Sequence, residues 1–167
     1  MIQASDEIYI LMGKIGMGME RIHHQLATLV SSISARHARY SELQQALTAV
    51  ISLRQITDLC EMLYLSLSQS DEGKHEFKEL IKQVRDLEQK RNGIVHSVWM
   101  PIGDGEFAKW KFARDKRSGI RFSGENFNVG EFESVATECG NLEKKLIFFV
   151  YTDFKRGGSP FHVHEIT

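Results

Sequence analysis

Apolar residues recur every three or four positions in the first part of the chain, and this spacing constrains the fold more than any other feature. From Ser5 to Ile33 the stripe consists of Ile8, Leu11, Met12, Ile15, Met19, Ile22, Leu26, Leu29 and Ile33. A period of this kind predicts an amphipathic α-helix. The two prolines of the chain, Pro101 and Pro160, lie outside the stripe. We therefore expect one long helix here.

Three later stretches have the same spacing, from Leu43 to Leu67, from Phe77 to Val98 and from Phe132 to Val150. The first of them should form a helix similar in length to the Ser5–Ile33 helix and pack antiparallel against it. The last helix should begin near Asn128, whose side chain can cap the backbone N–H of Glu131. The sequence thus predicts a mainly α protein, a four-helix up-and-down bundle.

Residues 100–123 interrupt the helical pattern with Pro101 and two turn signals, Gly-Asp-Gly and Arg-Ser-Gly, between alternating segments. One strand face would carry Ala108, Trp110 and Phe112, and the opposite face Phe107, Lys109 and Lys111. This alternation predicts a small β-hairpin or meander between the third and fourth long helices. The tail, residues 155–167, is expected to be mobile or to add a short strand.

Composition limits the class of protein. A chain of 167 residues, 42% hydrophobic and 26% charged, is expected to form a single domain spanning residues 1–167. Its net charge of -1 excludes a generally basic protein, so any contact with nucleic acid requires a local patch. Cys60 and Cys139 have no metal-like or secretory spacing, which predicts two core residues in a reducing compartment. We find no signal-like segment or membrane-spanning apolar run, and therefore expect a cytoplasmic protein without membrane contact.

The third apolar stripe passes through a cation, Arg91. On a helical wheel of about 100° per residue, five apolar residues lie within roughly 60° of this arginine. They are Val84, Leu87, Ile94, Val95 and Val98. An unpaired buried guanidinium is costly, so Arg91 must meet a carboxylate, a second subunit or a phosphate-bearing ligand.

An arginine, an asparagine and a histidine together suit phosphodiester cleavage. His96 could transfer a proton, Arg91 could neutralise the charge of a phosphorane, and Asn92 could orient either group. The alternative is structural: Arg91 pairs with Glu88 or Glu20, and His96 donates to a carbonyl at the helix end. Spacing and composition alone favour this structural alternative.

The run Arg91-Asn92-Gly93-Ile94-Val95-His96 resembles the Arg-polar-x-x-x-His motif of the HEPN superfamily. The order of two long helices, a motif-bearing third, a β insertion and a closing helix is similar to that of its bacterial members over nearly the whole chain. In catalytic members the arginine and histidine cleave RNA without a metal, usually in a cleft between two subunits, and leave a cyclic phosphate.

The resemblance implies a homodimeric, cofactor-free and metal-free endoribonuclease with Arg91, Asn92 and His96 as its catalytic residues. It also implies a defence or toxin–antitoxin setting, with an antitoxin-like protein as a candidate partner. Some family members bind nucleotides or serve as scaffolds, which leaves a non-catalytic nucleotide-binding or dimeric protein-interaction module as the alternative. Arg91 and His96 lie about 140° apart on an ideal wheel. A bend or an early helix end at Gly93, or a two-fold partner, could bring the two groups together.

A basic segment follows the motif and is a candidate RNA-binding rim with interleaved aromatic residues. Its predicted RNA-binding residues are Lys109, Lys111, Arg114 and Arg117. The alternative is a solvated hairpin whose Trp110 and Phe112 cover the bundle.

Two further motifs are assigned structural roles. The glycines between Gly13 and Gly18 lack the strand-turn-helix context of a phosphate loop and are expected to allow close helix approach. His23 and His24 are adjacent and face different directions on a helix, which argues against shared metal binding. His162 and His164 could share a strand face, but zinc needs further ligands, so no metal site is predicted.

Overall fold

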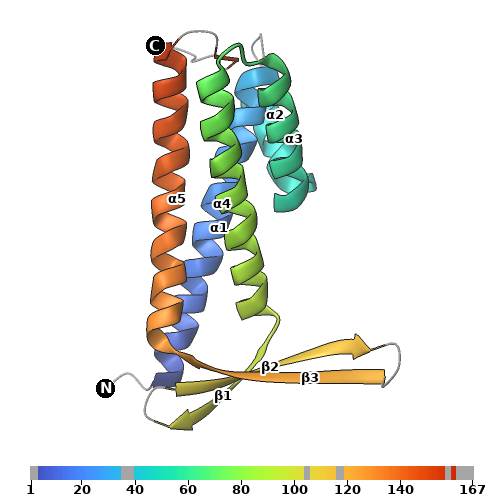
Figure 1. The fold of residues 1–167 in the computed structure, drawn as a ribbon, viewed down its shortest axis with the longest axis vertical. Helices are drawn as coiled ribbons and strands as arrows, with labels where there is room; N and C mark the ends of the chain where they lie inside the picture. Colours follow the sequence, from blue (N-terminus) through green and yellow to red (C-terminus); the bar gives the residue numbers. More distant parts are fainter. Residues whose placement is uncertain (1–3, 35–39, 104–105, 116–118, 157–158, 161–167) are drawn as a thin grey trace.

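The computed structural model describes residues 4–34, 40–103, 106–115, 119–156 and 159–160. The elements in chain order are α1 (Ala4–Ser34), α2 (Tyr40–Val50), α3 (Leu53–Leu67), α4 (Asp71–Val95), β1 (Val98–Gly103), β2 (Glu106–Asp115), β3 (Gly119–Asn128) and α5 (Val129–Arg156). The helices α1, α4 and α5 run side by side, with α2 and α3 at one end and the sheet at the other (Figure 1). The predicted helical fold with a small sheet insertion is confirmed.

Helix α1 forms the centre of the bundle, and its apolar stripe is buried as predicted. It lies along α5, and the two backbones approach closely at Gly18. A Cβ atom built on Gly18 would lie only 2.6 Å from the Cβ of Cys139 on α5. The expectation of close helix approach is therefore confirmed at Gly18, whereas Gly13 and Gly16 face open space.

The sequence predicted one helix from Leu43 to Leu67, but the structure has two, α2 and α3. Ser52 starts α3 with an extended backbone and accepts a hydrogen bond from the backbone N–H of Gln55 at 3.4 Å. The Gln55 side chain in turn accepts from the backbone N–H of Ser52 at 3.0 Å. This capping box stabilises a new helix start inside a continuous apolar stripe.

Helix α4 begins after Ser70, whose hydroxyl accepts from the backbone N–H of Gly73 at 3.0 Å. The apolar pattern predicted that this helix would continue to Val98, but it ends at Val95. The Ser97 hydroxyl donates to the Gly93 carbonyl at 2.6 Å, and the Trp99 indole donates to the Ile94 carbonyl at 2.9 Å. These two side chains satisfy carbonyls of the last turn and direct the chain into β1.

The insertion is an antiparallel meander of order β1-β2-β3. It covers residues 98–128, more than the 100–123 predicted, because β3 leads directly into α5 (Figure 1). The bundle is covered by the face that carries Phe107 and Lys109, both buried. This corrects the alternative in which Trp110 packed against the bundle, since Trp110 lies on the opposite, partly exposed face.

The start of α5 confirms the prediction at Asn128. The Asn128 side chain accepts from the backbone N–H of Glu131 at 3.1 Å, and the Glu131 carboxylate accepts from the backbone N–H of Asn128 at 3.2 Å. Cys60 and Cys139 are both buried and free, as predicted. Within the described residues, no helix is long and apolar enough to cross a bilayer.

Candidate functional site

The last turns of α4 carry the predicted motif, and its arginine is partly buried. The Nη1 atom of Arg91 donates to the Oδ1 atom of Asn92 at 2.9 Å, which ties the two neighbouring side chains together. The Nε atom of Arg91 is buried and has no hydrogen-bond partner among the described residues. One part of the guanidinium is therefore held in place, and another part is left unsatisfied.

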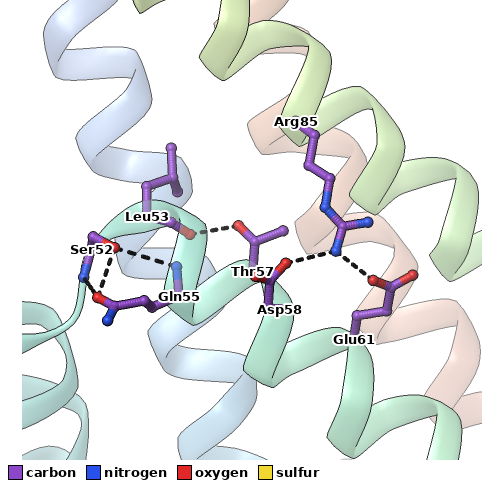
Figure 2. Close-up of polar contacts among 7 residues, drawn as sticks. All are labelled: Ser52, Leu53, Gln55, Thr57, Asp58, Glu61 and Arg85. Carbon is purple, nitrogen blue, oxygen red and sulfur yellow. Dashed lines mark hydrogen bonds and ion pairs between the residues drawn. The ribbon is translucent and has the colours of Figure 1, made fainter.

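Arg91 lines a pocket of about 360 Å³ between α1, the α2–α3 junction and α4. The other lining residues are Met19, Glu20 and His23 of α1, Thr48 of α2, Ser52 and Leu53 at the start of α3, and Glu88 of α4. The α3 capping box fixes the backbone at one wall of this pocket, and Figure 2 shows Ser52, Leu53 and Gln55 at that helix start. The arginine thus faces the junction between helices.

The two acids proposed as structural partners of Arg91 line the same pocket without forming an ion pair with it. Within the described part of the chain, no carboxylate oxygen lies within 4.0 Å of the Arg91 guanidinium. Glu20 instead has its Oε2 atom 3.9 Å from the Nδ1 atom of His23. The structural alternative, a neutralising Glu20 or Glu88 inside one subunit, is therefore not what the described residues form.

His96 caps the C-terminus of α4, and its side chain is exposed. Its backbone N–H donates to the Asn92 carbonyl at 3.2 Å. Helix α4 continues through Gly93 and ends shortly after it, at Val95. Arg91 lines the pocket between helices and His96 does not, in agreement with their wide separation on a helical wheel. A single subunit does not join these two groups in one cleft among the described residues.

Apolar side chains are exposed on both sides of His96. Val95 ends α4, and Val98, Met100 and Ile102 alternate along β1. Successive side chains of a strand point to opposite faces, so Val98 and Met100 share the outer face while Trp99 packs inward. Ile102 is also exposed and lies where the pairing of β1 with β2 is irregular, between Pro101 and Gly103. β1 is an edge strand of the sheet. An apolar surface of this kind on an edge strand is typical of a contact with another chain.

Arg85 belongs to the motif-bearing helix but is engaged in a structural network. Its Nη2 atom lies 2.8 Å from Asp58 Oδ1 and 2.6 Å from Glu61 Oε2, both on α3 (Figure 2). The hydrogen bond to Asp58 is the main cause that raises the pKa of Arg85 above its usual value. These contacts hold α3 against α4 and leave Arg91 as the arginine that faces the pocket.

The predicted RNA-binding rim begins with Lys109, which is buried against the bundle. Its ammonium group pairs with Glu125 and lies 5.1 Å from the ring centroid of Phe127 and 5.8 Å from that of Trp99. A cation engaged in this way is not free to contact a nucleic-acid backbone, which argues against the predicted role of Lys109. The side chains of Lys111 and Arg114, and the whole of Arg117, lie outside the described residues.

His23 lines the pocket beside Arg91, which the sequence interpretation did not predict. It follows Met19 by four positions on the buried stripe of α1, and this phase already places it toward the bundle. The adjacent His24 is exposed and lies 3.1 Å from the Gln44 side chain. The different environments of the two histidines agree with the expectation that they face different directions.

No group of three or more metal-ligating side chains occurs among the residues that the structure describes. His162 and His164 lie outside those residues. Comparison of the chain with protein-family models, with curated proteins and with solved structures gave no match. The function is therefore inferred from the residues of this chain and from their geometry.

Proposed function

We propose that this protein is a dimeric, metal-independent endoribonuclease of the HEPN type, with Arg91, Asn92 and His96 as its catalytic residues. The observation that carries the proposal is the state of Arg91. It is partly buried, bonded to Asn92 and without an ion-pair partner among the described residues. A desolvated guanidinium in this state is suited to contact a phosphate, because oxyanions are the acceptors that it binds most strongly.

The proposed reaction needs no cofactor. The 2′-hydroxyl of a ribonucleotide attacks the adjacent phosphorus, His96 takes up or returns the proton, and the bond from phosphorus to the 5′ oxygen breaks. The products are a 2′,3′-cyclic phosphate and a 5′-hydroxyl. Arg91 stabilises the extra negative charge of the transition state, and Asn92 holds the guanidinium through their hydrogen bond.

Dimerisation is part of the proposal because one subunit does not bring Arg91 and His96 into one pocket. The exposed apolar residues Val95, Val98, Met100 and Ile102 border His96 and supply a surface that a second copy could cover. A two-fold interface places the same surface of both copies together. Each His96 would then lie beside the motif-bearing helix of the other subunit.

The same separation of Arg91 from His96 favours the second candidate, a non-catalytic nucleotide-binding or scaffold module. In that case Arg91 binds a phosphate or supports the dimer, and His96 is a solvent-exposed helix cap. An antitoxin-like protein partner remains an extension of the family resemblance.

Cleavage of a mixed RNA by the purified protein in EDTA tests the proposal. We expect 2′,3′-cyclic ends from the wild type, and a loss of about 10²-fold or more for His96→Ala and Arg91→Ala. His75→Ala is the matched control, since His75 is an exposed histidine near the other end of α4. Equal cleavage by the wild type and all three variants would point to a contaminating nuclease and contradict the proposal.

A further inference from the structure

The pocket that Arg91 lines also has the imidazole of His23 in its wall. This residue is 8% exposed, and its Nε2 atom is buried without a hydrogen-bond partner among the described residues. The same is true of the Arg91 Nε atom. Both residues line the α1–α4 pocket, defined above by its lining residues. Two residues on different helices, each with one unsatisfied nitrogen among the described residues, therefore line one pocket.

Unpaired buried polar atoms are rare in folded proteins, because each loses its hydrogen bonds to water without replacement. The N–H of Arg91 Nε can only donate, so its missing partner must be an acceptor. The imidazole Nε2 of His23 also donates whenever this nitrogen carries the hydrogen. The group that satisfies both is one with several acceptor oxygens, and phosphate is such a group.

The start of α3 adds a third favourable element. Ser52 and Leu53 line the pocket, and α3 is a helix of 15 residues with its N-terminus at this wall. The N-terminal end of a helix carries a partial positive charge that favours anions. The partial charge at this helix end and the two unsatisfied nitrogens all favour an anion in the pocket.

Two acids, Glu20 and Glu88, also line the pocket and favour a phosphate compound that carries hydroxyl groups as well. Glu20 lies on α1 with His23, and Glu88 lies on α4 with Arg91. Glu20 Oε2 lies 3.9 Å from His23 Nδ1. Carboxylates accept hydrogen bonds from hydroxyl groups. A ribonucleotide carries both a phosphate and the hydroxyl groups that these acids can bind.

We infer that the α1–α4 pocket binds a ribonucleotide, with its phosphate on Arg91 and His23 and its ribose hydroxyls on Glu20 or Glu88. The inference rests on the proposed function and deepens it, because it places a phosphate of the RNA substrate at the helix junction. His23, rather than His96 of the same subunit, is then the imidazole next to Arg91. The volume of about 360 Å³ lies near the lower end of small-molecule sites, which span roughly 300–1,000 Å³.

Imidazole NMR signals of the full chain, titrated with cytidine 3′-monophosphate, test this site without requiring catalysis. We expect saturable shifts of the His23 ring signals and little change at His24. Both unsatisfied nitrogens are covered in the free protein, so binding requires a local movement of side chains around them. Inorganic phosphate should compete with the nucleotide, whereas cytidine alone should not, because it lacks the anion.

His23→Ala and Arg91→Ala should each weaken nucleotide binding roughly tenfold or more, the usual effect of removing a charge-assisted hydrogen bond. His24→Ala is the matched control and should bind as the wild type does. His23→Gln, checked for folding by circular dichroism, separates a lost contact from a lost fold. Arg91→Lys should bind more weakly than the wild type because it lacks the Nε–H donor.

The outcomes separate this inference from the proposed function. If the His23 signals do not respond to the nucleotide and His23→Ala binds as well as the wild type, the inference is overturned, even when RNA is cleaved. If the nucleotide binds at His23 and Arg91 but the wild type leaves RNA intact in EDTA, the pocket stands and the nuclease proposal fails.

Discussion

Arg91 keeps a partly buried charge at a helix seam without a carboxylate partner among the described residues. Such a charge is costly unless other groups compensate it, and Asn92 supplies only one hydrogen bond. The helical wheel already placed Arg91 among apolar residues. The sequence could not say what the side chain meets there, because the answer depends on residues of α1 and α3.

Lys109 is also a cation that packs against the bundle, but unlike Arg91 it has a carboxylate partner among the described residues. Its position in a run of basic residues favoured a nucleic-acid contact, but the structure buries it over two aromatic rings and pairs it with Glu125. The presence of a charged residue in the sequence does not show whether its side chain is exposed or buried in the fold. Strand alternation placed Phe107 and Lys109 on one face, and the buried Phe107 was the signal that this face packs inward.

The cysteine thiols should be unreactive in the folded protein. Burial raises the pKa of Cys139 to about 11 and that of Cys60 further above its usual range. Since only the thiolate reacts, at pH 8 Cys139 should react roughly 10²-fold more slowly with Ellman's reagent than a free thiol of pKa about 8.5. Both thiols should react at once in guanidinium chloride.

These raised pKa values also set a direction for stability. The unfolded thiols ionise above about pH 8.5 while the folded thiols stay neutral, so the thiols favour unfolding increasingly as the pH rises past that value.

In the labelling experiment with Ellman's reagent, the variant Cys60→Ala leaves Cys139 as the thiol whose reaction is measured. Rapid labelling of one thiol in the native protein would contradict the buried positions.

At the scale of the elements, the contact of α1 with α5 depends on Gly18. Gly18→Ala should lower the free energy of unfolding by about 1–3 kcal/mol, because the added methyl group would overlap Cys139 on α5. Gly13→Ala is the matched control on the same helix. It has open space around the added Cβ and should raise the stability by about 0.5–1 kcal/mol, since alanine favours the helix.

Urea unfolding followed by circular dichroism measures both changes. If Gly18→Ala were as stable as Gly13→Ala, the close approach of α1 and α5 at this position would be wrong. The two variants have the same chemical change, so a difference between them reports the packing and not the intrinsic helix preference of alanine.

The helix ends differ in how well the sequence predicted them. The α5 start was predicted at Asn128, because an asparagine three residues before a glutamate is a local capping signal. The same type of signal exists at Ser52 and Gln55, but the sequence interpretation did not use it and followed the continuous apolar stripe. The α4 end at Val95 was not predicted, since it depends on side chains of Ser97 and Trp99 that bond back to the helix.

At the scale of the whole molecule, the sheet lies at one end of the bundle, and the connection from α4 to β1 carries His96 (Figure 1). The exposed apolar residues of β1 follow directly. In the proposed dimer these residues are covered by the second copy, so its stability should depend on them.

Met100→Asp should shift the protein from dimer to monomer in sedimentation velocity, because the interface would bury an unpaired carboxylate. Met62→Asp is the control, since Met62 is an exposed methionine on α3, in the part of the bundle away from the sheet. It should leave the dimer intact. A wild-type protein that stays monomeric at all concentrations, or a dimer that persists in Met100→Asp, would contradict this interface.

The sequence alone was enough to predict the helical stripes, the sheet insertion, the α5 cap, the buried cysteines and the position of the motif near the end of a helix. These features depend on residues close together in the chain, whose spacing fixes the face that each one occupies. The pocket that His23 and Arg91 share and the burial of Lys109 could not be predicted in this way. Contacts between distant segments depend on how helices rotate and approach one another, and the periodicity of a single helix does not specify that.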